Sequence, residues 1–311
     1  MRLLTRSDFD GLACGTILKE LGLIEDGVKF VHPKDIQDGI ILANGNDVLA
    51  NIPYVEGAGL WFDHHSSEEI RLGDMKDIPG KREITPSCAR IVYEYYGGKK
   101  KFPHFEEMIK YVDRVDSGNL TREEVLNPKG WVLLGFIMDP RTGLGRFRNF
   151  RIPNYQLMEK LMIDLQTKEI SEILKDVDVA ERIELYNEQT RLFKAMIEKH
   201  TRIEGNVIVT DLRGVEQIYT GNRFYIYSLY PEQNISIWLV DGRKVDGVAM
   251  NCSFAVGYSI LNRTCKTNVG ALMLQYGGGG HHQVGTCQVE NTNVDFVLDA
   301  LVKKMLIDEE A

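Results

Sequence analysis

The sequence predicts an α/β protein with two domains joined by a helical connector. Three observations predict this fold. Short apolar runs typical of strands alternate with helical segments in the first third of the chain, a long charged segment follows, and a second series of β-rich runs begins after Gly205. The chain has 311 residues and 43% hydrophobic residues, enough for two cores. We expect a larger domain at 1–180, the connector at 181–204 and a smaller α/β domain at 205–311.

The first domain begins with a predicted strand, turn and helix. Residues 2–5 have the composition of a short strand, and residues 11–21 place small and apolar side chains at the spacing of a helix packed on a sheet. Short apolar runs at 28–31, 47–50 and 60–62 are separated by polar or glycine-containing segments. This pattern predicts a parallel sheet flanked by helices.

Helices are predicted from Pro86 onward. The segment 86–93 has proline near its start and glycines after its end, and the segments 105–115 and 155–165 continue the helical pattern. The charged segment 168–200 has apolar residues at helical intervals. We interpret it as an amphipathic helix that covers a core and contains the connector.

The second domain is also predicted to be α/β. Residues 207–209, 224–227 and 235–240 are rich in β-branched and aromatic side chains, which favours strands. Residues 268–276 predict a helix that ends in a run of glycines, and residues 294–305 predict a closing amphipathic helix.

The composition limits the classes of function. A formal net charge of −8 argues against a protein that grips long duplex nucleic acid, whereas a short anionic ligand in a local basic pocket stays compatible. The five cysteines include no C-x-x-C pair, so we expect no disulfide framework and a reducing compartment. No uncharged apolar run reaches the roughly 18 residues that span a membrane. We therefore expect a cytoplasmic protein without a membrane partner.

The first motif that carries chemistry is Ser7-Asp8-Phe9-Asp10-Gly11, between the first strand and its helix. Alternate residues of an extended chain point the same way, so Asp8 and Asp10 can present two carboxylates to one divalent cation. An aspartate that caps the helix is the alternative interpretation of this motif.

Two further motifs offer metal ligands. Asp63, His64 and His65 follow a predicted buried strand, and they supply an imidazole ligand, a carboxylate that can orient an imidazole, and a second imidazole. A pair of surface histidines is the alternative. Asp113 and Asp116 are both placed near the end of a predicted helix, where either carboxylate could reach inward.

The fourth motif is the glycine run 277–280, which is followed by His281 and His282. Consecutive glycines let backbone N–H groups approach an anion closely, and a histidine beside them can add a donor. A flexible linker is the alternative, but it fits poorly between a predicted helix and a predicted strand.

These four motifs occur in the order and approximate spacing of the DHH phosphoesterases with a C-terminal DHHA1 domain, and the chain resembles that superfamily over nearly its whole length. The resemblance implies a metal site with one or two ions, usually Mn²⁺ or else Mg²⁺. It implies that His65 contacts the scissile phosphate and that Asp63 contacts the ligand side chains but not the metal. The implied metal ligands are Asp8, Asp10, His64 and Asp116, and the implied substrate-binding residues are Arg263, Gly278, Gly279, Gly280 and His281.

The sequence departs from the superfamily pattern at two positions. Leu4 stands where many members have a metal-binding histidine, and Asn51 stands where an aspartate that bridges two metals is expected. An amide oxygen can still bind a metal weakly, but it lacks the negative charge. Three alternatives stay open: two weakly bound metals, one metal with altered chemistry, or a site that binds ligand without turnover.

We therefore expect a metal-dependent phosphoesterase that hydrolyses short nucleotides or oligonucleotides at the cleft between the domains. Short RNA, linear dinucleotides and 3′-phosphoadenosine 5′-phosphate are the substrates that the resemblance implies. The alternative is a non-catalytic or weakly active nucleotide-binding protein, for which Asn51 is the reason. A homodimer is left open.

Overall fold

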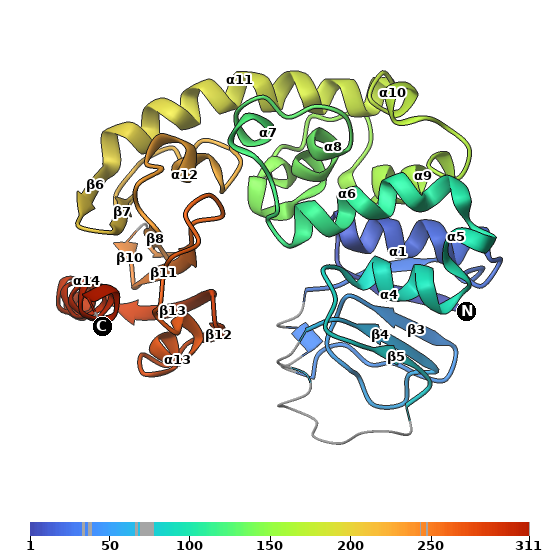
Figure 1. Ribbon diagram of the computed structural model, residues 1–311, viewed down its shortest axis with the longest axis horizontal. Coiled ribbons are helices and arrows are strands. Elements are labelled where there is room, and N and C mark those ends of the chain that lie inside the picture. Colours follow the sequence, from blue (N-terminus) through green and yellow to red (C-terminus); the bar gives the residue numbers. More distant parts are fainter. Residues whose placement is uncertain are drawn as a thin grey trace. The chain divides into compact units, whose positions relative to one another are not determined.

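The computed structural model describes residues 1–32, 35–36, 39–65, 68, 78–242, 244–246 and 248–310 (Figure 1). The side chains at 244, 245, 281 and 310 lie outside this description. Two compact units are present. One contains Met1–Leu120 and Asn127–Asn187, and the other contains Thr121–Leu126 and Glu188–Ala311. Thr121–Leu126 are grouped with the second unit, although they lie within the range expected for the first domain. The α/β class is confirmed.

The first unit contains a five-stranded sheet in which every described pairing is parallel. The strand order is β2-β1-β3-β4-β5. The strands are β1 (Arg2–Thr5), β2 (Val28–Phe30), β3 (Asp47–Ala50), β4 (Leu60–Asp63) and β5 (Gly80–Arg82). The first four confirm the predicted runs, because buried parallel strands are continuously apolar. The three residues of β5 are too polar for this signal.

The register of this sheet brings three strand ends to one edge. Thr5 at the end of β1 pairs with Ala50 at the end of β3, and Ala50 pairs with Phe62 in β4. The segments that follow these strands therefore emerge side by side, at the carboxyl edge where α/β proteins commonly bind ligands. Two of the four sequence motifs, and Asn51, lie at this edge.

Helices cover the first sheet, and α1 is central among them, with contacts to α4, α6 and α9 (Figure 1). Their bounds are α1 (Phe9–Glu20), α4 (Cys88–Tyr95), α5 (Gly98–Lys101), α6 (Glu106–Asp116), α8 (Gly130–Met138), α9 (Asn154–Asp164) and α10 (Ile170–Ile173), with short 3₁₀ turns at Pro103–Phe105, Pro140–Thr142 and Leu144–Arg146. The predicted helices are confirmed within a few residues. The long helix α11 (Val177–His200) contains the boundary between the units.

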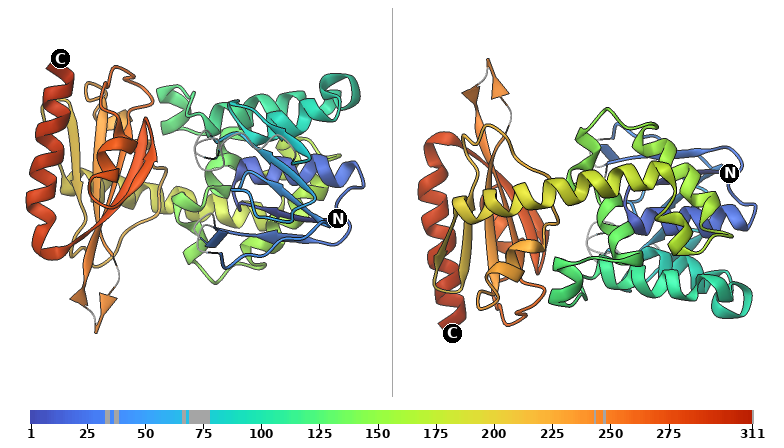
Figure 2. Two further views of the ribbon diagram at one scale, coloured as in Figure 1. Left: turned by 90° about the horizontal axis from the view of Figure 1, so that it is seen from below. Right: turned by 90° about the horizontal axis from the view of Figure 1, so that it is seen from above.

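The second unit contains a six-stranded sheet in the order β12-β13-β11-β8-β7-β6. The pair β7–β8 is parallel and the others are antiparallel. The strands are β6 (Thr201–Glu204), β7 (Val207–Asp211), β8 (Ile235–Asp241), β11 (Asn251–Tyr258), β12 (Gly279–His281) and β13 (Val284–Glu290). The hairpin of β9 (Lys244–Val245) and β10 (Val248–Ala249) projects beyond this sheet (Figure 2).

The core of the second unit forms between its sheet and its helices. The helix α14 (Val294–Glu310) buries Leu301 and Met305 against strand residues such as Val209 and Ile237, and α13 (Val269–Leu274) packs on the same core. The remaining helices of this unit are α7 (Arg122–Leu126) and α12 (Tyr225–Leu229), with a 3₁₀ turn at Asn291–Asn293. In the described residues, no helix is both long and apolar enough to cross a membrane.

One prediction for the second unit is wrong. Residues 224–227 form no strand; α12 occupies most of this segment, because the Asn222 side chain accepts a hydrogen bond from Phe224 N at 2.9 Å and so starts a turn. The hydroxyl of Tyr227 is then buried, 2.8 Å from Ser236 Oγ. The end of the glycine run forms a short strand, since Gly279–His281 pair with β13.

Candidate active site

Asp10 is held by the start of a neighbouring helix. It lies in the first turn of α1, and its two carboxylate oxygens accept hydrogen bonds from Cys88 N at 2.9 Å and Ala89 N at 2.7 Å. Burial raises the pKa of Asp10 well above its ordinary value, and the negative charges of Asp116 and Asp8 raise it further. The carboxylate is thus fixed in place where a cation would stabilise its charge.

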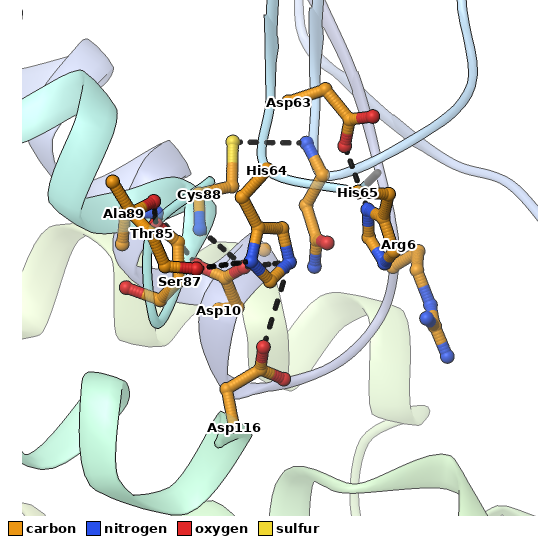
Figure 3. Close-up of polar contacts among 12 residues, drawn as sticks. Arg6, Asp10, Asp63, His64, His65, Thr85, Ser87, Cys88, Ala89 and Asp116 are labelled. Atoms are coloured by element: carbon orange, nitrogen blue, oxygen red, sulfur yellow. Dashed lines mark hydrogen bonds and ion pairs between the residues drawn. The ribbon is translucent and has the colours of Figure 1, made fainter. Parts of the chain in front are cut away.

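His64 lies close to two carboxylates. Its Nδ1 lies 3.1 Å from the carbonyl oxygen of Thr85, which can only accept, so Nδ1 carries a proton. Nε2 is buried without a hydrogen-bond partner, 3.7 Å from Asp10 Oδ2 and 3.5 Å from Asp116 Oδ2 (Figure 3). A divalent ion among these atoms could be bound by the Nε2 lone pair and by both carboxylates.

These three side chains fit a divalent ion. Among the described residues, Asp10, His64 and Asp116 offer ligand atoms that all lie within 4.8 Å of one another. Two ligands at about 2.1 Å from a common ion are roughly 3–3.5 Å apart in octahedral or tetrahedral geometry. The donor set of two carboxylates and an imidazole suits Mn²⁺, Mg²⁺ or Zn²⁺.

Asp116, rather than Asp113, is the carboxylate of α6 that faces this group. Asp113 accepts hydrogen bonds from Ser87 Oγ at 2.7 Å and from the Arg90 guanidinium at 2.6 and 3.0 Å. Burial raises the pKa of Asp116, although the charge of His64 opposes this shift. Asp113 therefore joins the end of α6 to the start of α4. Asp116 is the carboxylate of α6 that is available to bind a cation.

Asp63 orients His65 and not His64. The Nδ1 atom of His65 lies 2.8 Å from Asp63 Oδ1, and Asp63 is buried. Burial lowers the pKa of His65, but the hydrogen bond and charge of Asp63 outweigh it, so the net shift is upward. The rings of His64 and His65 are 4.3 Å apart, which places the His65 imidazole next to the candidate metal ligands.

Asp8 has a different environment from Asp10. Its Oδ1 accepts hydrogen bonds from Gly11 N at 2.9 Å and from Asn51 Nδ2 at 3.0 Å, and its Oδ2 is 3.2 Å from Arg6 Nε. Asp8 is thus the N-cap of α1, as in the alternative interpretation of the first motif. The capping interpretation applies to Asp8, whereas Asp10 lies in the candidate metal site.

The predicted substrate residues lie in the second unit. Gly278 and Gly280 are required by packing, since a Cβ there would come within 2.0 Å of Thr286 O and 2.2 Å of Val284 O respectively. A Cβ at Gly279 would meet nothing within 4 Å. Arg263 is exposed, and its Nε donates to Ile260 O at 3.1 Å. The side chain of His281 lies outside the described part of the chain, and the roles of these residues stay predictions.

Sequence reasoning missed two arginines. Arg6 lies two residues before Asp8, so the period-two argument that joined Asp8 and Asp10 also applied to it. Arg141 follows α8 and lies near the site, where its charge lowers the pKa of Asp116. No motif signals Arg141, because tertiary packing alone brings it there.

The chain is similar to proteins that act on nucleotides. No family model matches the sequence. The pGpG-specific phosphodiesterase PggH from Vibrio cholerae has 46% sequence identity with the chain and a TM-score of 0.83, and the match covers 99% of each chain. An exopolyphosphatase-related protein from Bacteroides fragilis has 13% identity and a TM-score of 0.53, and covers 97% of this chain and 91% of its own. This second likeness shows a shared fold.

Two other proteins match over a smaller share of their length. The Mn²⁺ complex of RecJ from Thermus thermophilus has 14% identity and a TM-score of 0.51, with 98% of this chain and 52% of RecJ covered. The A-adding tRNA nucleotidyltransferase of Aquifex aeolicus is 21% identical over 247 residues, which are 79% of this chain and 25% of that protein. The chain thus spans about a quarter of that curated relative.

Proposed function

Because the chain belongs to the DHH/DHHA1 superfamily, whose members hydrolyse phosphoester bonds, we propose that it is a divalent-metal-dependent phosphodiesterase that cleaves pGpG or a similar linear dinucleotide. One observation carries this proposal: the chain is 46% identical to a pGpG-specific phosphodiesterase over 99% of both chains. The group formed by Asp10, His64 and Asp116 supports it independently.

The residues at the carboxyl edge of the first sheet have complementary roles. Asp10, His64 and Asp116 would hold the ion, which when bound polarises a phosphoryl oxygen and makes water more acidic. Thr85 fixes the ring orientation and the tautomer of His64. The Nδ1–H group of His65 donates a hydrogen bond to Asp63. His65 can therefore carry positive charge opposite a non-bridging phosphate oxygen.

Recognition of the nucleotide is assigned to the second unit. A Cβ would meet no atom within 4 Å at Gly277 or at Gly279, but Gly277 has a positive φ of 73° that favours glycine. Neither packing nor a positive φ explains the glycine at 279, and a close approach of a ligand to its backbone would explain it. We assign to Gly278, Gly279, Gly280, His281 and Arg263 the binding of a phosphate or base of the dinucleotide. Short linear nucleotides suit a chain with a net charge of −8, because a small anion needs only a local basic site.

A second candidate function is nucleotide binding without turnover. The observation that favours it is Asn51, whose amide donates to Asp8 instead of offering a carboxylate to metals. The two functions differ in whether product forms, so one assay separates them.

The test is hydrolysis of pGpG by the purified chain with Mn²⁺ or Mg²⁺, beside pApA, a five-nucleotide RNA, 3′-phosphoadenosine 5′-phosphate and polyphosphate. We expect pGpG to be cleaved to GMP and His64→Ala to lose at least about 10³-fold in kcat/KM, because a metal ligand is removed. His104→Ala, a partly exposed histidine paired with Glu20 in the same unit, is the matched control and should retain activity. Binding of pGpG without product in any metal would support the second candidate instead.

A further inference from the structure

Most acceptor sites of the Asp8 carboxylate are occupied by donors of the protein itself. Asp8 is 4% exposed, and one oxygen accepts from both Gly11 N and Asn51 Nδ2 while the other faces Arg6 Nε at 3.2 Å. A metal ion at the remaining lone pair of Asp8 Oδ2 would lie beside the Arg6 guanidinium, whose positive charge opposes its binding. His64 Nε2 differs in that it is buried and has no hydrogen-bond partner among the described residues.

The amide of Asn51 is oriented so that it stabilises the Asp8 charge. A carboxylate only accepts hydrogen bonds, so the part of the amide that faces Asp8 at 3.0 Å must be the NH₂ group. Asn51 is 2% exposed, has a positive φ of 59°, and donates its backbone N–H to Phe62 O at 3.1 Å, which fixes its position. An aspartate here would place two buried carboxylates in contact and require a cation between them.

Leu4 cannot contribute a ligand and belongs to the core. It is fully buried in a cluster with Val31, Leu49, Ile52 and Trp61. The side of the site around Asp8 therefore has one carboxylate, one amide and one guanidinium, and residue 4 adds no imidazole to it.

The charge at the site suits a single ion. Asp8, Asp10, Asp116 and Arg141 line one small cavity. Arg6 pairs with Asp8, and Arg141 pairs with Asp139 at 2.8 Å. The two carboxylates that face His64 Nε2 then carry two negative charges, which one divalent ion neutralises.

We infer that this chain binds one divalent ion, at Asp10, His64 and Asp116, and that the guanidinium of Arg6 acts in place of a second cation against the substrate phosphate. Asp8 holds this guanidinium, and Asn51 in turn holds Asp8. This inference rests on the proposed function. Arg6 is in position for it: its side chain is 25% exposed, and Figure 3 shows it beside His65, whose protonation its charge opposes.

The chemistry of a guanidinium fits this role. Its planar fork of N–H donors binds phosphate oxygens and stays charged at any pH that the protein meets. It can stabilise the negative charge that develops on the phosphoryl oxygens as the P–O bond breaks. Arg6 is therefore a catalytic residue in this account, and Asn51 is a positioning residue that acts through Asp8.

The first test counts ions without any substrate. Titration calorimetry of the metal-free, full-length chain with Mn²⁺ should give one ion per chain, and His64→Ala should abolish it. Arg6→Ala should still bind one ion. The double variant Arg6→Ala/Asn51→Asp should bind a second, because it restores a carboxylate and removes the competing guanidinium. Two ions per wild-type chain would overturn the inference and leave the proposed function intact.

The second test separates Arg6 from a structural role. Arg6→Ala should lower kcat for pGpG by about 10²-fold with Mn²⁺ saturating, and guanidinium chloride at millimolar concentration should restore part of the loss. Arg148→Ala, an exposed arginine of the same unit, is the matched control and should change neither activity nor its response to guanidinium. An Arg6→Ala enzyme within about threefold of wild type would overturn the assigned role, whereas a wild type without turnover would overturn the proposed function.

Discussion

The two aspartates of the first motif are both buried and yet have opposite surroundings. Asp8 is neutralised within the chain by Arg6, Asn51 and the start of α1. Asp10 receives two backbone N–H donors, but it faces Asp116 and His64 Nε2. A buried carboxylate that is paired with donors and a cation of the protein stabilises the fold. A cluster of buried carboxylates that the protein leaves without a cation indicates a site where a ligand binds.

Among the substitutions that separate the two kinds of carboxylate, we expect the largest effect on metal affinity at Asp116. Asp116→Asn removes one of the two uncompensated charges, so the affinity for Mn²⁺ should fall at least about 100-fold. The metal-free variant should unfold at the same temperature as the wild type or higher, since burial disfavours the Asp116 charge. Calorimetric titration and thermal unfolding in EDTA measure the two quantities. A variant that is less stable without metal, with Mn²⁺ affinity unchanged, would refute the assignment.

Asp113 is the matched carboxylate on the same helix, and the opposite result is expected there. Asp113→Asn weakens the pairing with Arg90 and Ser87, so the free energy of unfolding should fall by about 1–2 kcal/mol. The number of Mn²⁺ ions bound should stay the same. Chemical denaturation of the metal-free protein checks the first quantity, and loss of the metal in this variant would show that Asp113 and Asp116 do not have separate roles.

The smallest effect on activity is expected in the glycine run. There, too, a residue needed for packing can be told apart from a neighbour that packing does not require. Gly279→Ala adds a methyl group where no atom lies within 4 Å, so stability should be retained and KM for pGpG should rise by about threefold to tenfold if this strand binds the substrate. Gly280→Ala should instead lower the unfolding temperature, because its φ of 155° and the close carbonyl of Val284 leave no room for a Cβ. Unchanged kinetics for Gly279→Ala would remove Gly279 from the proposed substrate site.

The sequence predicted the first unit better than the second for a physical reason. Buried parallel strands such as β1 and β3 are short apolar runs that no exposed face interrupts, so their composition alone identifies them. In β13 the buried positions are Gly285, Cys287 and Val289, and such small side chains give little alternating signal. The aromatic segment at α12 has strand propensity, but local hydrogen bonding at Asn222 overrides it.

The motifs predicted which residue types form the site, but they did not predict which of these residues contact one another. Asp10, His64 and Asp116 were expected to be ligands, and the structure brings them together. The sequence placed Asp8 in the same group, and it could not reveal the contacts with Arg6 and Asn51 that give Asp8 other partners. Which residues pair across the sheet edge depends on register and side-chain rotamers, which no local pattern encodes.

The central claim is that a metal-dependent phosphodiesterase site is assembled with one ion and one arginine. A crystal of the full-length chain grown with Mn²⁺ and a non-hydrolysable pGpG analogue, with anomalous scattering measured at the manganese edge, tests it most directly. We predict one anomalous peak, within ligand distance of Asp10, His64 and Asp116, and the Arg6 guanidinium on a phosphate oxygen of the analogue. Two peaks that share Asn51, or one peak at Asp8 with Arg6 turned away from the phosphate, would contradict the account.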